Sequence, residues 1–464
     1  MHVKRILLAS VCALVLVACA TTSPVPQRAA SDVPTAFEQP VAEAAPIWPE
    51  PDWWRGFNSE ELNSLIAATQ GGNLNVAAAE TRILQADARV REVGSVLLPT
   101  VSIGSDTNLR TGNGGATPTG ISLGASYEFD FWGRNRSLVR AAEASNRGTR
   151  ADRETVALTA VSATASTYFQ LLSLRERLEI SRLNLENAQA VLAVTEARVR
   201  NGIASPLELA QQRQTIAGQQ AQIPQLEQQE LETRAALALL LGRPPEGFDV
   251  IARDLASIEA PSVAPGLPSE LLVRRPDVVT AEANLEGANA NLAVARAALL
   301  PSISLTASGG ISTGTLTGLV TNPLYTAGIG LSIAQTIFDA GRREAVTDEA
   351  RAREQELLLS YRGTIITAFS EVETTLGSIT HLDEQVMFQA EQVAQSELAF
   401  NIAQARYREG VDDFLIVLDA QRSLYQTRDQ LQQARLQQLL SLVALYKALG
   451  GGWEDTAATV AQQQ

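Results

Sequence analysis

Residues 178–202 read LEISRLNLENAQAVLAVTEARVRNG and lie within a longer segment, residues 134–201, that contains no proline. Large apolar side chains recur in this stretch every seven positions, at Leu178, Leu185, Leu192 and Val199. Smaller side chains follow three positions later, at Ser181, Ala188 and Thr195. This heptad pattern predicts a helix that packs along a seam. Residues 134–201 would extend on the order of 100 Å as a helix, whereas globular helices average roughly 11–12 residues, so the pattern predicts a coiled-coil rod.

The same pattern returns later in the chain, where residues 386–410 read VMFQAEQVAQSELAFNIAQARYREG. Gly410 follows Gly202 by 208 positions, and two further pairs of segments match at the same offset. These pairs are Trp132-Gly133-Arg134 with Ala340-Gly341-Arg342, and Leu241-Gly242 with Leu449-Gly450. An offset held over more than a hundred residues indicates an internal duplication. We therefore predict two structural repeats, residues 47–242 and 269–453, joined by a connection at residues 243–268.

Each repeat has the same predicted order of elements. A helix that ends at a proline comes first, then two alternating stretches, then a long helix, then a further helix. The helices are predicted at residues 60–98, 134–201 and 206–241, and again at residues 276–300, 342–409 and 414–449. Gly202 and Gly410 suit helix ends, and Ser205 and Asp413 suit the N-caps that follow. We expect both helical hairpins to lie together at one tip of the rod.

Four stretches alternate between apolar and polar residues, as strands of transmembrane β-barrels do, with the apolar side chains facing lipid. Most odd positions in residues 101–109, 121–131, 303–311 and 327–337 hold apolar side chains, with Ser105, Thr107 and Gln335 among the exceptions. An ordinary hairpin with one buried face remains the alternative. The smallest outer-membrane barrels have roughly eight strands, so four strands require an oligomer, and the strand count alone leaves dimer and trimer open.

The N-terminus has the features of a bacterial lipoprotein signal. Lys4 and Arg5 precede a short apolar run, and Leu16-Val17-Ala18-Cys19 resembles a lipobox. This resemblance implies cleavage after residue 18 and lipidation, including palmitate, at Cys19. Residues 19–46 would form a flexible tether and residues 454–464 a polar tail. Ala20 after the cysteine favours the outer membrane by analogy, and no later segment is apolar enough for a membrane helix.

The composition excludes several classes of function. The formal charge of -14 does not suit nucleic-acid binding. The two histidines and two cysteines provide no metal-spaced cluster, and the chain has no phosphate loop or nucleophile elbow. We therefore predict no catalytic residue, no cofactor and no metal, and a protein that is not an enzyme.

Three segments resemble the TolC family of outer-membrane factors, in particular its lipoprotein branch that serves resistance-nodulation-division efflux pumps. They are residues 53–57 (WWRGF), 267–277 (LPSELLVRRPD) and 410–422 (GVDDFLIVLDAQR). The resemblance implies an α+β membrane protein, with a long α-helical coiled-coil barrel and four transmembrane strands per chain that close as a 12-stranded β-barrel in a homotrimer. It also implies an equatorial belt near residues 243–268, a periplasmic adaptor, an inner-membrane pump, and passage of small molecules such as drugs to the exterior.

The second hairpin carries the candidate gate residues, which are Asp413, Leu415, Asp419 and Arg422. In a trimer each would form a ring of three, with Leu415 as an apolar constriction and the two aspartates as charged rings that favour cations. The resemblance implies that these residues close the tunnel at its periplasmic end. The alternatives are a simple N-cap at Asp413, core packing at Leu415, and a surface pair between Asp419 and Arg422; for Asp412 we expect a solvated side chain.

Two other functions remain open at this point. A channel for type I protein secretion would have the same architecture with larger cargo, and a coiled-coil lipoprotein without a pore would share the long helices. The alternating stretches argue against the second of these.

Overall fold

The computed structural model describes residues 50–107, 119–255, 258–261, 271–314, 317–451 and 453. The predicted signal peptide, Cys19, the tether and the polar tail lie outside these residues.

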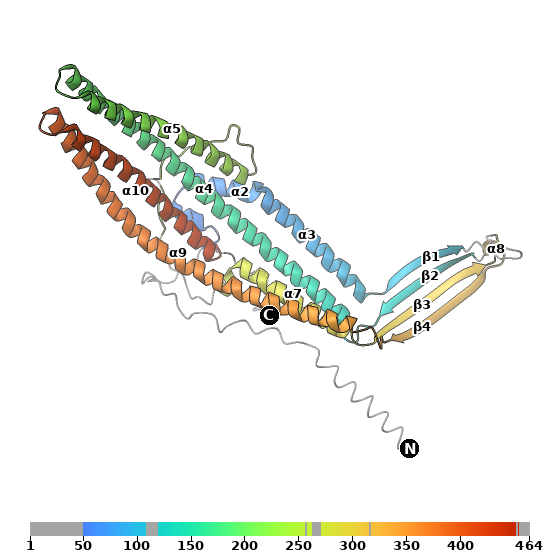
Figure 1. Cartoon of the computed structure of the whole chain (residues 1–464). Coiled ribbons are helices and arrows are strands. Elements are labelled where there is room, and N and C mark those ends of the chain that lie inside the picture. Colours follow the sequence, from blue (N-terminus) through green and yellow to red (C-terminus); the bar gives the residue numbers. More distant parts are fainter. Residues whose placement is uncertain are drawn as a thin grey trace, which may run out of the picture. The chain divides into compact units, whose positions relative to one another are not determined.

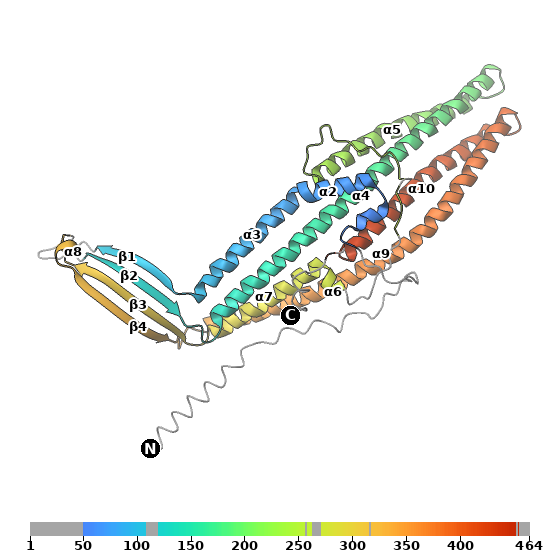
Figure 2. The same cartoon turned by 180° about the vertical axis from the view of Figure 1, so that it is seen from behind.

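Figures 1 and 2 show the order of the elements. In the first half these are η3 (Trp53–Phe57), α2 (Glu60–Gly72), α3 (Leu74–Gly94), η4 (Ser95–Leu97), β1 (Thr100–Thr107), β2 (Thr119–Glu128), α4 (Arg134–Arg200) and α5 (Pro206–Leu240). In the second half they are α6 (Leu271–Arg274), α7 (Pro276–Ala297), β3 (Ser302–Thr313), α8 (Gly318–Thr321), β4 (Leu324–Ala334), α9 (Arg342–Arg408) and α10 (Phe414–Ala448).

The described residues divide into two compact units. Unit 1 contains residues 81–152 and 277–364, and unit 2 contains the remaining described residues. The long helices α4 and α9 are 67 residues each, as the heptad pattern predicts, and each contributes residues to both units.

Unit 1 contains an antiparallel sheet with the strand order β1-β2-β3-β4. Its register pairs odd-numbered residues with odd-numbered residues, for example Ile103 with Leu123 and Ile303 with Ile333. Because side chains alternate between the faces of a strand, this register brings the apolar positions of all four strands to one face. Ile329 on this face is 83% exposed. The predicted alternation is therefore confirmed, and the apolar face is uncovered within one chain.

The opposite face of the sheet is lined by small polar residues. Ser304 and Ser332 lie on paired strands, and their hydroxyl oxygens are 2.7 Å apart. Glycines stand opposite serine or threonine at several even positions, as Gly330 does opposite Thr306. The sheet thus has one apolar and one polar face. Among the helices of the described ranges, none combines the length and hydropathy that crossing a membrane requires.

The prediction of a single helix at residues 60–98 is wrong, because the structure has two helices there, α2 and α3. The chain leaves helical geometry at Asn73, where ψ is 120°, and it restarts as α3 one residue later. Gly71 and Gly72 weaken the helix before this point. The Asn73 side chain then accepts hydrogen bonds from the backbone N–H groups of Asn75 and Val76, at 2.9 and 3.2 Å, as a helix cap does. Its amide also donates to the carbonyl of Leu240 on α5 at 2.8 Å.

The main core of unit 2 joins η3, α2, α4, α5 and α10. Trp53 stacks on Tyr446 with ring centroids 4.7 Å apart, and Phe57 packs against Phe169 at 5.0 Å. These rings lie within one cluster of buried side chains with leucines of α2, α4 and α10. Aromatic rings bury large areas, so this cluster is a principal source of the stability of unit 2.

A buried arginine fixes part of the connection between the repeats. Arg175 on α4 is 4% exposed, and its guanidinium pairs with Glu230 and Asp249 and donates to the carbonyls of Val250 and Ala252. Partial burial raises the pKa of Asp249, but hydrogen bonds from Arg175 and from a backbone N–H outweigh this effect and leave that pKa lowered. Residues 249–252 are therefore attached to α4 by charged hydrogen bonds.

We expect Asn73→Ala to destabilise unit 2 by about 2 kcal/mol, because it removes a helix cap and leaves the Leu240 carbonyl without its donor. Urea unfolding of the purified protein measures the change. Asn75→Ala, at an exposed neighbour, is the control and should cost less than about 0.5 kcal/mol. Equal losses for the two variants would show that Asn73 has no special role at the break.

Candidate channel gate at the paired helical hairpins

The first hairpin joins α4 to α5 through a short turn. Gly202 has φ of +69°, a region that favours glycine, and follows the last residues of α4. Ser205 caps α5 in a reciprocal capping box with Glu208, and Pro206 occupies the first turn. The predicted cap is thus confirmed, and the turn needs little length because both helix ends are capped locally.

The second hairpin joins α9 to α10 and is closed by an ion pair. Gly410 has φ of +76°, and Asp413 stands at the N-cap of α10, although its side chain makes no capping hydrogen bond. Arg406 donates to both carboxylate oxygens of Asp412, at 2.6 and 2.9 Å. This contact lowers the pKa of the Asp412 carboxyl. The expectation of a merely solvated Asp412 is wrong, because a two-pronged hydrogen bond holds it across the turn.

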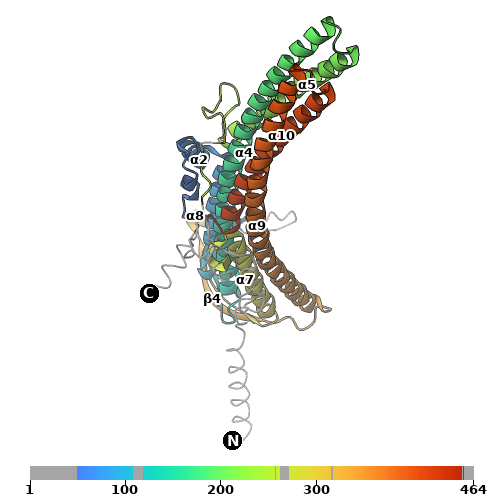
Figure 3. The same ribbon diagram turned by 90° about the vertical axis from the view of Figure 1, so that its left-hand side faces the viewer.

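Three side chains connect the two hairpins. Arg198 on α4 donates to the backbone carbonyl of Tyr407 at 2.6 Å, and its guanidinium lies 4.4 Å from the centre of the Tyr407 ring. The hydroxyl of Tyr407 donates to the carboxylate of Glu208 on α5 at 3.0 Å. Burial raises the pKa of Tyr407, so it stays a protonated donor at neutral pH. The hairpins lie side by side, as predicted (Figure 3).

An apolar cluster and a buried polar chain support these contacts. The cluster is formed by side chains of α4, α9 and α10: Val191, Phe400, Ala403, Tyr407, Phe414, Val417, Leu418, Leu424 and Tyr425. Gln421 donates to the hydroxyl of Tyr425, which donates to the backbone carbonyl of Asn184 at 2.6 Å. Burial raises the pKa of Tyr425 to about 12. The second hairpin is therefore fixed to α4 by packing and by hydrogen bonds.

The four predicted gate residues all point away from this core. Leu415 is 66% exposed, and Asp413, Asp419 and Arg422 are exposed as well. Leu415, Asp419 and Arg422 share one face of α10, because their spacing follows the helical repeat. The alternative interpretation, in which Leu415 packs in the core, is therefore wrong within one chain. In the described parts of the chain, no side-chain hydrogen bond or ion pair holds Asp413, Asp419 or Arg422.

Sequence reasoning did not single out Arg198, Tyr407 or Glu208 as a group. A signal was present in the duplication: Arg198 and Arg406 occupy equivalent positions, but Ala204 stands where the second repeat has Asp412. Without that local carboxylate, Arg198 extends to the other hairpin. Comparing the repeats position by position would have identified it.

The comparisons with known proteins agree on one family. The model of the family described as outer membrane efflux protein matches residues 65–243 and 267–451. The pyoverdine export outer membrane protein OpmQ of Pseudomonas putida KT2440 is 43% identical over 460 residues, which cover 96% of this chain and 97% of that protein. The cation efflux system protein CusC of Escherichia coli K12 is 32% identical over 456 residues, covering 95% and 98%.

Solved structures agree with this result. The outer-membrane channel OprN superposes with a TM-score of 0.85 at 28% identity and covers 94% of this chain and 100% of that one. The open state of the Neisseria gonorrhoeae MtrE outer membrane channel gives a TM-score of 0.83 at 28% identity, covering 93% and 99%.

The fold and the paired hairpins thus define an outer-membrane channel protein. The chain belongs to the outer membrane efflux protein family. It is an efflux channel of the outer membrane, in a family made up of channel proteins rather than enzymes.

We expect Tyr407→Phe to raise the open fraction of the channel about fivefold to tenfold. The change removes the hydrogen bond to Glu208, worth roughly 1–1.5 kcal/mol, and keeps the ring under Arg198. Single-channel recording in planar bilayers measures the open fraction. Tyr325→Phe, on the exposed apolar face of β4, is the control and should leave it unchanged. An open fraction equal to that of the unmodified channel in both variants would contradict a locking role for the Tyr407 hydroxyl.

Proposed function

We propose that three copies of this chain form the exit duct of a tripartite efflux pump, gated at the hairpin tips. The observation that carries this proposal is the unpartnered stripe of Leu415, Asp419 and Arg422 on an otherwise well-packed hairpin. Three copies around an axis would bring each of these residues into a ring. Arg422 would then tie neighbouring helices together.

The sheet supports the same assembly. Within the described residues β1 pairs only with β2 and β4 only with β3, so both edges of the sheet are open. Unpaired backbone groups are costly in lipid. Pairing of β4 in one copy with β1 in the next closes a sheet of twelve strands, with the apolar face toward lipid and the polar face toward the duct. Residues 47–242 and 269–453 then act as two repeats around the axis, with residues 243–268 in an equatorial belt.

The gate residues suggest how the closed state works. Leu415 would form an apolar constriction, and Asp413 and Asp419 would form rings of carboxylates that favour cations. Opening separates the second hairpin from the first, so the contacts of Arg198 and Tyr407 must break. A partner that binds the separated hairpins more tightly than the closed ones shifts the population to the open state.

The tips provide a surface for such a partner. Ile203, Leu207 and Val411 are each more than 60% exposed in the turns and first residues of the hairpins. Exposed aliphatic side chains at a helical tip suit a periplasmic adaptor that presents its own apolar tips. The adaptor would connect the duct to a resistance-nodulation-division pump in the inner membrane, which supplies the energy.

The names of the most similar relatives support an inference about the class of cargo. The two relatives named for pyoverdine export are 43% and 38% identical to this chain, above the cation efflux relatives at 32%. We infer that the duct passes a secreted small molecule of the siderophore class, although related channels are named for antibiotic and toluene efflux.

We expect neutralising both aspartates, with Asp413→Asn and Asp419→Asn, to lower the cation-over-anion permeability ratio on the order of threefold. Reversal potentials in a salt gradient measure the ratio. Glu391→Gln on α9 removes one exposed carboxylate per chain away from the turn of the hairpin and should leave the ratio unchanged. A ratio unaffected by the double substitution would exclude these aspartates from the duct.

We expect Leu207→Asp with Val411→Asp to reduce export by about tenfold or more, because charged tips do not pack against an apolar adaptor. Export is measured as the siderophore that accumulates in the medium. The strain carries a deletion of its siderophore export channel gene and is complemented with each variant of this protein. Leu74→Asp, at an equally exposed position away from the tips, is the control. Full export by the double variant would argue against docking at the tips, and full export by the uncomplemented strain would refute the proposed cargo.

We further infer that Cys19 is lipidated and anchors the protein in the outer membrane. Cys19→Ser should abolish incorporation of labelled palmitate, whereas Cys12→Ser, within the predicted signal peptide, should leave it intact. Mass spectrometry of the mature N-terminus is the measurement. Incorporation that persists in Cys19→Ser would disprove the anchor.

A further inference from the structure

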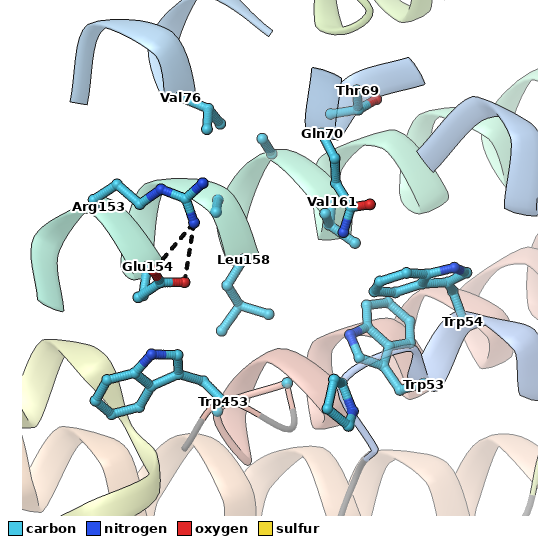
Figure 4. Close-up of a pocket in the computed structure, with 15 residues that line it drawn as sticks. Trp53, Trp54, Thr69, Gln70, Val76, Arg153, Glu154, Leu158, Val161 and Trp453 are labelled. Carbon is cyan, nitrogen blue, oxygen red and sulfur yellow. Dashed lines mark hydrogen bonds and ion pairs between the residues drawn. The ribbon is translucent and has the colours of Figure 1, made fainter. Parts of the chain in front are cut away.

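Unit 2 contains a cavity of about 260 Å³ whose lining includes none of the candidate gate residues. Figure 4 shows it between α4, α2, the start of the described chain and the end of α10. Its walls are formed by Pro51, Trp53, Trp54, Thr69, Gln70, Val76, Arg153, Glu154, Ala157, Leu158, Ala160, Val161, Gly450, Gly451 and Trp453. The cavity is thus lined by segments from both ends of the described chain.

The lining is chiefly aromatic and aliphatic, and its charges are matched. Arg153 donates to Glu80 at 2.8 Å and to Glu154 at 3.1 Å. The hydrogen bond from Arg153 to Glu80 is the main reason that the pKa of Arg153 is raised. Because the Arg153 guanidinium already has two carboxylate partners, it has little free charge to attract an anionic ligand. The cavity therefore favours a neutral occupant.

One buried polar group in the wall has no partner. Trp53 is 4% exposed, and its indole nitrogen, Nε1, is buried without a hydrogen-bond acceptor among the described residues. Tyr446 covers one face of the ring at 4.7 Å. The nitrogen lies on the side of the ring that faces Leu158 and Trp453 (Figure 4). An unmet buried donor costs about 1–3 kcal/mol, and a bound acceptor would recover that cost.

The other buried polar wall residue is satisfied. The hydroxyl of Thr69 lies 3.1 Å from the carbonyl of Leu65, to which it donates, and 2.9 Å from the hydroxyl of Thr164. The Trp53 indole is therefore the group that would orient a ligand, while the apolar walls would contribute most of the affinity. Binding pockets commonly combine mostly apolar walls with a few directed polar groups.

We propose that this cavity binds a neutral aromatic or alicyclic molecule that carries one hydrogen-bond acceptor directed at Trp53 Nε1. The volume suits a molecule of about 10–15 non-hydrogen atoms, since pockets for drug-sized ligands start near 300 Å³. A ligand there would contact α4, η3 and the segment after α10 at once. It would tie the start of the described chain and the end of α10 to the long helix.

A matched pair of probes tests the proposal on the purified, detergent-solubilised channel. The first probe, 2-acetylnaphthalene, is neutral and carries a ketone acceptor, whereas 2-ethylnaphthalene has nearly the same size and no acceptor. Incorporation of 5-fluorotryptophan gives each tryptophan its own ¹⁹F signal, and Trp53→Phe identifies the signal of Trp53. We expect titration of that signal to give about fivefold tighter binding for the ketone, the value of one neutral hydrogen bond.

Three variants and two contrary outcomes complete the test. In Trp53→Phe, followed through the Trp453 signal, the two probes should bind equally, whereas Trp54→Phe should keep the preference for the ketone. Ala157→Phe, which fills the cavity, should abolish binding of both probes. Equal affinity of the two probes in the unmodified protein would overturn the proposal. So would a Trp53 signal that neither probe moves, the result expected if the chain's own residues before Glu50 occupy the cavity.

Discussion

The open edges of the four-stranded sheet are the constraint on which the rest of the structure depends. One chain supplies a sheet whose apolar face is exposed and whose outer strands, β1 and β4, have one paired side each among the described residues. Such a sheet is not stable alone in lipid, because every backbone group there needs a partner. The assembly of several copies proposed above supplies these partners, and it would turn single side chains on α10 into rings. The gate proposed at the hairpin tips thus depends on the pairing of strands between copies.

Duplication followed by divergence explains how the hairpins came to be linked. Arg198 and Arg406 are equivalent residues with different partners. Arg406 closes its own turn through Asp412, whereas Arg198 lacks that carboxylate and bonds to Tyr407 in the other repeat. Glu208 both caps α5 and accepts from the Tyr407 hydroxyl. A few substitutions between two copies of one motif thereby produce a contact that joins the copies.

Periodic patterns predicted the regular parts of the fold closely. The long helices end within one residue of the expected positions, and the odd-numbered apolar residues share a face of the sheet. These features are predictable because helix and strand periods are local properties of the chain. The break at Asn73 was missed because its decisive contact, to Leu240, comes from a residue 167 positions away. The contacts of Arg198 and Tyr407 were missed for the same reason, since about 200 residues separate the partners. Exposure of Leu415 and Asp419 agrees with the predicted gate, but the rings themselves belong to an assembly of several chains.

Cross-linking between edge strands tests the central claim most directly. A cysteine at Ser105 on β1, combined in turn with a cysteine at each odd position of β4, is oxidised in the outer membrane in a Cys12→Ser background. The proposed assembly predicts that one register gives covalent products that stop at three chains and form a closed ring. Absence of cross-links at every register, or products that stop at two chains or extend beyond three, would contradict a trimeric duct.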